Sequence, residues 1–340
     1  MLPLIESPSE TLNLPGTATC NFCGAQAPFE DVEIDSYQKG FWCTDCDGYN
    51  YFSPERQATH RFTLIIEDKA SINMSIPNTK LKLNKRISPL RYPGGKSRLA
   101  NFIASKLQAN SSRTLVSPFA GGASVELSLL EAGVIEQLIL NDLDFGVYSL
   151  FWTIQNAPYE LEERIKTFTP SHNDFFIAQD LIKNDYAGCT IFEAAWSLLL
   201  VNRLAYSGIY KANPLGGRRG MQHHLLSRWN PKNLIMRIRK IHSLSRSIQI
   251  FNKDACDIIE EMYWSSNTTM FLDPPYVQKG KQLYRCFYEE NDHIKLNVLL
   301  ESLYQGFPGA DIILCYDNDP FIKSNYIFPE VEKISRAYSI

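Results

Sequence analysis

The segment Asp273-Pro-Pro-Tyr276 follows the apolar run Thr269–Leu272 and could do chemistry on an amino group attached to an aromatic ring. Two prolines stop strand pairing and fix the backbone direction, so the Asp273 carboxylate and the Pro274 carbonyl can face one spot. Two acceptors there would take the amino hydrogens and localise the nitrogen lone pair, which prepares the nitrogen to attack a methyl carbon. The ring of Tyr276 offers a face on which an extruded base can stack. The alternative is an ordinary turn at a strand end, because Asp-Pro commonly opens a turn.

Glycines and an acid are spaced as in a nucleoside-binding site. Gly121 and Gly122 follow an apolar run, and glycine lets the backbone approach a ligand closely. Asp142 comes 21 residues after Gly121, at the end of the next apolar run. An acid at the tip of the second strand of such a unit can hold ribose hydroxyls. Asp142 could instead cap a helix that starts near Phe145, and the two roles can coexist.

Four cysteines near the N-terminus have the spacing of a structural zinc site. Two C-x2-C pairs are separated by nineteen residues, so two tight knuckles can complete a tetrahedron of thiolates. Four thiolates close the coordination sphere, and we therefore expect structural Zn²⁺ without chemistry. The alternative is four unrelated buried thiols. Such a zinc ribbon would serve either as an extra nucleic-acid contact or as a docking module for a protein partner. The predicted ligands are Cys20, Cys23, Cys43 and Cys46.

Four motifs in order resemble the Dam-type (α-class) adenine-specific DNA methyltransferases. They are Leu90-Arg-Tyr-Pro-Gly-Gly-Lys96, Pro118-Phe-Ala-Gly-Gly-Ala-Ser124, Asn141-Asp142 and Asp273-Pro-Pro-Tyr276. The resemblance covers roughly residue 88 to the end. It implies a Rossmann-like α/β methyltransferase fold, S-adenosylmethionine as methyl donor and double-stranded DNA as substrate, with the target adenine flipped out of the helix. Two other functions stay open: an RNA adenine methyltransferase, and a non-catalytic DNA-binding regulator that retains the fold.

Residue roles follow from the resemblance position by position. Asp254 resembles the acid placed near the adenine of the cofactor, although it could equally cap a helix. We expect Asp292 to cap another helix. The chain stops at Ile340, about where the last strands of the family would still be running, so a truncated chain and a shortened sheet edge both stay open. The resemblance implies catalytic roles for Asp273, Pro274 and Tyr276, and cofactor contacts for Tyr92, Lys96, Phe119, Gly121, Asp142, Asp254 and Asp273.

The block from Ala194 to Lys253 contains no Asp or Glu, although acids make up 37 of 340 residues. Sixty acid-free positions would arise by chance about once in a thousand. The block holds eleven of the Lys and Arg residues, so the rest of the chain carries −3 − 11 = −14 charges. It lies where the family places its target-recognition region and suits contact with phosphates. The alternative is a solvated basic face. The residues predicted to bind DNA are Arg203, Tyr206, Tyr210, Lys211, Asn213, Arg218, Arg219 and Arg228.

Short apolar runs alternate with helical patterns from about Ile87 onward, which is typical of βαβ units and a mostly parallel sheet. The predicted strands are Arg113–Ser117, Gln137–Leu140, Ser247–Phe251, Thr269–Leu272 and Asp311–Cys315. The predicted helices are Ser124–Ala132, Phe145–Gln155, Ile191–Leu204 and Pro231–Ser243.

The length of 340 residues suits one large α/β domain plus a small module. We expect a zinc ribbon over residues 1–70, a linker over 71–86 and a methyltransferase domain over 87–340, with a helical and loop target-recognition insertion at about 157–246. A hydrophobic content of 44% and a charged content of 21% are those of a soluble protein. No apolar run reaches the roughly 18 residues of a membrane span, and the N-terminus lacks a secretory pattern. These features predict a cytoplasmic protein without membrane contact.

Overall fold

The computed structural model describes residues 60–68, 81, 83–84, 86–91, 96, 99–265, 267–277, 280, 285–306 and 309–335, together with Asp45 and five short strands before residue 52. The chain divides into two compact units. The N-terminal unit contains Met1–His60 with Glu301–Pro308, and the sheet unit contains Arg61–Leu300 with Gly309–Ile340.

The N-terminal unit contains small antiparallel strands. One pair joins β1 (Thr17–Thr19) to β2 (Gln26–Pro28), and a three-stranded sheet joins β3 (Glu33–Ile34), β4 (Gly40–Trp42) and β5 (Tyr49–Tyr51). Among the described residues, no three His, Cys, Asp or Glu side chains are grouped to hold a metal ion. The predicted zinc ligands lie outside the described residues, so zinc binding stays a prediction: Cys20, Cys23, Cys43 and Cys46.

A parallel sheet of seven strands forms the centre of the sheet unit. The strand order is β12-β6-β11-β10-β7-β8-β9, and every pairing between neighbours is parallel. The middle strand β10 is buried along its whole length, as expected for a parallel strand covered on both faces. The strands are β6 (Phe62–Asp68), β7 (Thr114–Ser117), β8 (Gln137–Asn141), β9 (Ile248–Phe251), β10 (Thr268–Leu272), β11 (Asp311–Asp317) and β12 (Glu330–Ser335).

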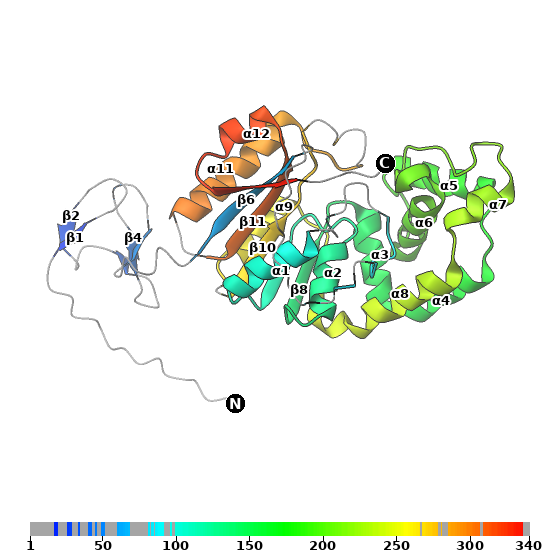
Figure 1. Cartoon of the computed structure of the whole chain (residues 1–340), viewed down its shortest axis with the longest axis horizontal. Helices are drawn as coiled ribbons and strands as arrows, with labels where there is room; N and C mark the ends of the chain where they lie inside the picture. The colour runs from blue at the N-terminus through cyan, green and yellow to red at the C-terminus, as the bar shows by residue number, and fades with distance from the viewer. Residues whose placement is uncertain are drawn as a thin grey trace. The chain divides into compact units, whose positions relative to one another are not determined.

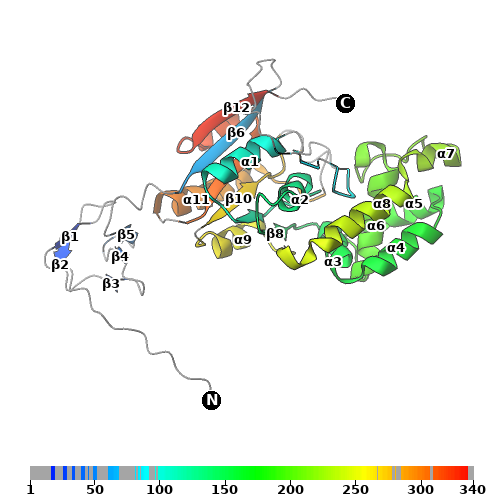
Figure 2. The ribbon, with the colours of Figure 1, turned by 60° about the horizontal axis from the view of Figure 1, so that its bottom comes forward.

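Helices cover both faces of this sheet, which makes a Rossmann-like α/β fold (Figures 1 and 2). The helices α1 (Ala100–Ala109) and α2 (Ser124–Glu131) lie on one face. The other face carries α9 (Ala255–Met262), α11 (Glu290–Gly306) and α12 (Pro320–Asn325). No helix in the described part of the chain is both long enough and apolar enough to cross a bilayer.

A helical lobe connects β8 to β9 and appears in green at one end of the sheet in Figure 1. Capping boxes start two of its helices, with Ser171 and Asp174 at α5 and Thr190 and Glu193 at α6. Helix α3 packs against α6, which attaches the lobe to the sheet. The helices are α3 (Phe145–Asn156), α4 (Pro158–Thr167), α5 (His172–Lys183), α6 (Ile191–Leu204), α7 (Gln222–Leu225) and α8 (Pro231–Ser243).

The predicted strands and helices agree with the structure to within two residues at each end. The predicted boundary of the small module at residue 70 differs from the structure. Strand β6 pairs with β11 and β12 inside the large sheet, and Phe62, Leu64 and Ile65 are buried. The sheet unit therefore begins at about residue 61, and residues 71–80 of the expected linker lie outside the described residues.

The expectation that Asp292 caps a helix was wrong by three positions. Helix α11 begins at Glu290, and Asp292 lies in its first turn. The Asp292 Oδ2 atom accepts a hydrogen bond of 2.9 Å from the backbone N–H of Glu289. Asp292 thus reaches back to the residue before the helix, as the third residue of a capping box does.

Candidate active site

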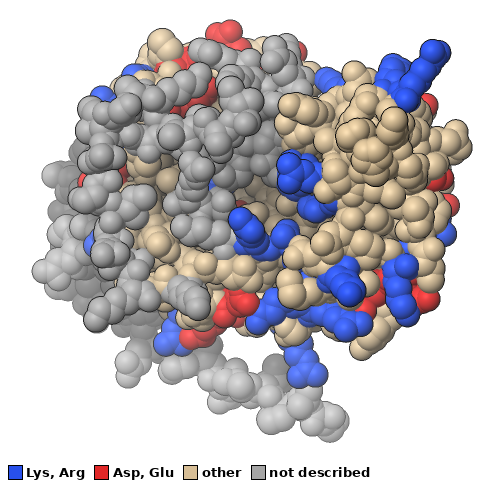
Figure 3. Space-filling model, turned by 45° about the vertical axis from the view of Figure 1, so that its right-hand side comes forward, with Lys and Arg blue, Asp and Glu red and all other residues tan. Residues whose placement is uncertain are grey.

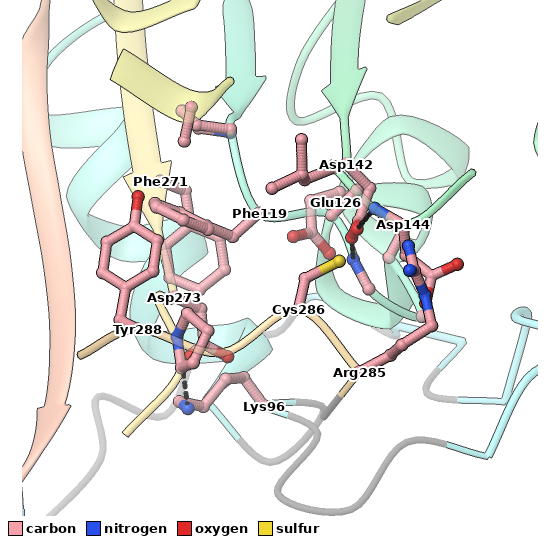
Figure 4. A pocket seen from close by; sticks show the side chains of 18 of the residues that line it. Lys96, Phe119, Glu126, Asp142, Asp144, Phe271, Asp273, Arg285, Cys286 and Tyr288 are labelled. Atoms are coloured by element: carbon pink, nitrogen blue, oxygen red, sulfur yellow. Dashed lines mark hydrogen bonds and ion pairs between the residues drawn. The ribbon is translucent and has the colours of Figure 1, made fainter. Parts of the chain in front are cut away.

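A single cavity lies at the carboxyl ends of β7, β8 and β10 (Figure 4). The chain leaves β7 toward β8 and leaves β10 toward β11, so the strand order reverses between these neighbours. Parallel α/β sheets bind ligands at such a reversal. The structure brings six of the seven predicted cofactor residues to this cavity, and the seventh, Tyr92, lies outside the described residues. The six are Lys96, Phe119, Gly121, Asp142, Asp254 and Asp273.

The glycine turn is attached to the tip of β8. Gly121 has a positive φ of 48°, which glycine adopts without strain, and its N–H donates to Asp142 Oδ2 at 2.7 Å. The Asn141 amide donates to the Pro118 carbonyl at 3.0 Å. Ala120 N–H donates to the Asn141 carbonyl at 2.9 Å. These bonds hold the turn beside the acid in the arrangement that the spacing of the motif predicted.

Asp142 does not cap a helix, so the prediction that it could be the N-cap of the helix near Phe145 was wrong. The N-cap of α3 is Asp144, whose Oδ1 accepts from Gly146 N–H at 2.9 Å. Asp142 instead uses Oδ1 to accept from Asp144 N–H at 2.9 Å. Burial, followed by the neighbouring charge of Asp144, raises the pKa of Asp142 to about 7.

Asp254 caps a helix, which is one of the two roles that the sequence left open, and its contact with the cofactor stays a prediction. Its Oδ1 atom accepts from Cys256 N–H at 2.8 Å and so caps α9. Asp254 also lines the cavity. The cap fixes the position of the residue at the end of β9, at the same edge of the sheet as Asp142.

The Lys96 ammonium is buried and binds three side chains from distant segments. It donates to Asp273 Oδ1 at 2.5 Å and to the Tyr276 hydroxyl, and it forms an ion pair with Glu67 Oε1 at 3.1 Å. Only 4% of Lys96 is exposed. Burial alone would lower the pKa of Lys96, but the charges of Asp273, Tyr276 and Glu67 raise it well above its usual value. Lys96 therefore stays charged and holds the Asp273 carboxylate in place.

The residues Asp273–Tyr276 divide between the cavity and the interior. Asp273 and Pro275 line the cavity, whereas Pro274 and Tyr276 are not part of its wall. Tyr276 is only 6% exposed, and its hydroxyl accepts from Lys96. The stacking face that we predicted at Tyr276 is therefore turned inward. Aromatic rings do reach the cavity from elsewhere, namely from Phe119, Phe271, Phe287 and Tyr288.

One wall of the cavity is positioned by ion pairs that the sequence did not predict. Arg285 Nε pairs with Asp144 Oδ2 at 3.0 Å, and the guanidinium also bonds Asp185. The Tyr186 hydroxyl donates to Asp144 Oδ1 at 3.2 Å. These interactions fix the position of Arg285, three residues before Tyr288. The Tyr288 ring packs edge-on against Phe119, with the ring centroids 5.6 Å apart. Neither a motif nor an apolar period marks these residues.

The structure separates the predicted DNA-binding residues into surface and interior groups. Tyr206 is 67% exposed, whereas Arg203 is only 8% exposed and points into the protein. The loop after α6 is closed by a 3.0 Å bond from Tyr206 N–H to the Asn213 carbonyl. Lys211, Asn213, Arg218, Arg219 and Arg228 are exposed, and Tyr210 is half-buried.

Figure 3 shows several Lys and Arg side chains on the face that carries the helical lobe. Some basic residues of the acid-free block have acidic partners from outside it. Arg239 pairs with Glu162 at 2.7 Å, and Lys240 pairs with Glu131 at 3.0 Å. For these residues of the acid-free block, the alternative of an ordinary solvated basic face therefore fits better than contact with DNA.

Comparison with known proteins decides the family. The family described as D12 class N6 adenine-specific DNA methyltransferase matches residues 92–339. The chain belongs to this family. It is an enzyme that transfers a methyl group to the 6-amino group of adenine in DNA. A relative, the type II methyltransferase M.CviBI of Paramecium bursaria Chlorella virus NC1A, is 23% identical over 216 residues, which is 61% of this chain and 76% of the relative. The match favours DNA over the RNA alternative.

We predict that Lys96→Met destabilises the methyltransferase by about 3–5 kcal/mol at pH 8, because two carboxylates then lose their buried counter-charge. The unpaired carboxyls would have raised pKa values, so the loss should shrink at pH 5, where they bind protons. Urea unfolding at both pH values measures the effect. The control Lys183→Met removes an exposed partner of Asp180 and should cost under about 1 kcal/mol. Equal losses for the two variants would contradict a central role for Lys96.

Proposed function

We propose that the methyl donor is S-adenosylmethionine bound in the cavity, and that the target adenine is flipped out of duplex DNA to meet it. The single observation that carries the proposal is the position of the Asp273 carboxylate, which Lys96 holds at the edge of a cavity that also contains the Gly121–Asp142 site. One acceptor for an aromatic amine and one for a ribose thus share a single space.

The charges of the cavity fit this cofactor. Among the residues that the structure describes, its lining carries five acids and two cations, Lys96 and Arg285, each of which pairs with one of these acids. A net negative cavity suits a ligand with a sulfonium and an ammonium group. The five acids are Glu126, Asp142, Asp144, Asp254 and Asp273.

When bound, S-adenosylmethionine supplies a methyl group on a positively charged sulfur. In this proposal Asp142 accepts hydrogen bonds from the ribose hydroxyls, and Asp254 lies near the adenine ring of the cofactor. Asp273 accepts an amino hydrogen of the target adenine, which helps to localise the nitrogen lone pair for attack on the methyl carbon. Pro274 does not line the cavity, so its carbonyl as the second acceptor rests on the sequence motif alone. Much of the rate would come from orientation, worth up to roughly 7–11 kcal/mol in favourable cases.

We predict that Asp273→Asn lowers the rate of methyl transfer by at least about 10²-fold, because an amide has a single acceptor atom and cannot accept both from Lys96 and from the amino group of the adenine. The affinity for DNA should change little. Transfer of a radiolabelled methyl group to duplex DNA measures the rate. The control Asp257→Asn alters an exposed carboxylate on α9 and should keep the wild-type rate. Near-normal turnover of Asp273→Asn would refute the assignment.

A second prediction concerns pH. Because the pKa of Asp142 is raised to about 7 in the folded protein, its carboxyl is mostly protonated at pH 6 and mostly ionised at pH 8. The ionised form is the better acceptor for ribose hydroxyls, so cofactor affinity should rise roughly ten-fold over this interval. Isothermal titration at several pH values measures it.

Two variants identify the titrating group. Asp142→Asn should bind weakly at all pH values, without the rise. Glu126→Gln removes the other cavity carboxyl whose pKa burial raises to about 7, and it should keep the rise. The opposite pattern would assign the dependence to Glu126 and contradict the role of Asp142.

We also propose that Cys20, Cys23, Cys43 and Cys46 bind a structural Zn²⁺, on the strength of their spacing. Metal analysis of the purified chain should find zinc, and Cys43→Ser with Cys46→Ser should remove it. Wild-type protein isolated without bound metal would contradict the proposal. Deleting residues 1–60, which spares β6, then tests the role of the ribbon: weaker DNA binding would favour a nucleic-acid contact, and unchanged binding a protein partner.

A further inference from the structure

Five arginines converge on a second pocket in the sheet unit. Two of them precede α1, one ends α6, one precedes α8 and one lies within α8. The remaining wall is formed by Ser88, Leu90 and Ser124. The arginines are Arg86, Arg91, Arg203, Arg228 and Arg237.

These guanidinium groups have no acidic partner among the residues that the structure describes. Their bonds go to main-chain carbonyls instead. Arg203 Nε and Nη2 donate to the Arg228 carbonyl at 3.1 and 2.7 Å, and Arg237 Nη1 donates to the Ser88 carbonyl at 2.7 Å. Arg239, two residues further along α8, does have a carboxylate partner in Glu162. No described acid therefore balances the positive charge of this pocket.

The pocket is strained electrostatically as it stands. Burial, followed by the charges of Arg237, Arg91 and Arg228, lowers the pKa of Arg203 to about 10. Burial also lowers the pKa values of Arg91 and Arg237. Two buried donors, Arg91 Nη1 and Arg237 Nε, have no acceptor among the described residues. Buried donors are nearly always satisfied, so an acceptor from outside the chain is expected here.

The Arg91 backbone is held in advance of any ligand. Asn202 Oδ1 accepts from Arg91 N–H at 2.7 Å, and Asn202 Nδ2 donates to the Arg91 carbonyl at 2.9 Å. The next residue in α6 is Arg203, so one helical turn positions both arginines. A site whose donors are already in place binds its ligand at a lower entropic cost.

We propose that this pocket binds a backbone phosphate of the DNA substrate beside the target adenine. Ser124 lines both this pocket and the active-site cavity, so the two sites are neighbours. An oxyanion could also come from the carboxylate of the cofactor. The cofactor carries a net positive charge, however, and five cations would repel it, whereas a phosphodiester is anionic and accepts paired bonds from arginine. The inference deepens the proposed function by naming the part of DNA that is bound.

The test removes the two exposed arginines, since their side chains form no bond within the described structure and folding should survive. In Arg86→Gln with Arg228→Gln, DNA affinity at moderate ionic strength should fall about ten-fold or more. The slope of log affinity against log salt concentration should fall by about 1. Both changes should be equal for duplexes with and without the target sequence, because a phosphate contact carries no base information. Fluorescence anisotropy over a salt series measures both quantities.

A matched control removes two charges elsewhere. Arg113→Gln with Lys166→Gln alters exposed residues that pair with Glu136 and Glu163, and it should keep the wild-type slope. Equal loss of slope in both double variants, or no loss in either, would overturn the site. Weaker S-adenosylmethionine binding with an unchanged DNA slope would identify the anion as the cofactor carboxylate and also overturn it. The anisotropy assay measures DNA binding and does not depend on methyl transfer. A wild-type chain that binds DNA but transfers no methyl group would therefore refute the proposed function and leave the phosphate site untouched.

Discussion

The buried ammonium of Lys96 between the carboxylates of Glu67 and Asp273 is the interaction on which the site depends. It joins the end of β6, the segment before α1 and the end of β10, three places far apart in the chain. A buried charge is tolerated only when its partners are present, so each of the three segments constrains the other two. The result is a carboxylate of defined orientation at the edge of a ligand cavity, as catalysis by positioning requires.

The sheet topology explains how these groups come to the same place. All seven strands are parallel, so their carboxyl ends share one edge. Glu67 near the end of β6, Asp142 after β8 and Asp273 after β10 meet there without any contact in sequence. The same edge presents an acid-rich cavity next to an arginine-rich pocket, with Ser124 common to both. Opposite charge excesses in adjacent sites suit two ligands of opposite charge, a cationic methyl donor and a polyanion.

Local patterns explain what could be predicted. The Gly121–Asp142 spacing and the Asp273–Tyr276 turn are short-range features, and they led to the cavity. Glu67 was not predicted as a site residue, because β6 precedes a polar segment of mixed composition. The strand is recognisable only through its pairing with β11 and β12. The burial of Arg203 could not be predicted from the charge pattern, because α6 is buried from Ala194 to its end and tertiary packing decides where this side chain lies. Tyr276 turned inward because Lys96 binds its hydroxyl.

The most direct test of the account is a crystal structure of the enzyme with S-adenosylhomocysteine and duplex DNA containing the target adenine. The account predicts the adenine outside the helix, its amino nitrogen within roughly 2.6–3.2 Å of the Asp273 carboxylate, and Lys96 still bound to that carboxylate. An adenine amino group held by other residues, with Asp273 turned away from both ligands, would contradict it.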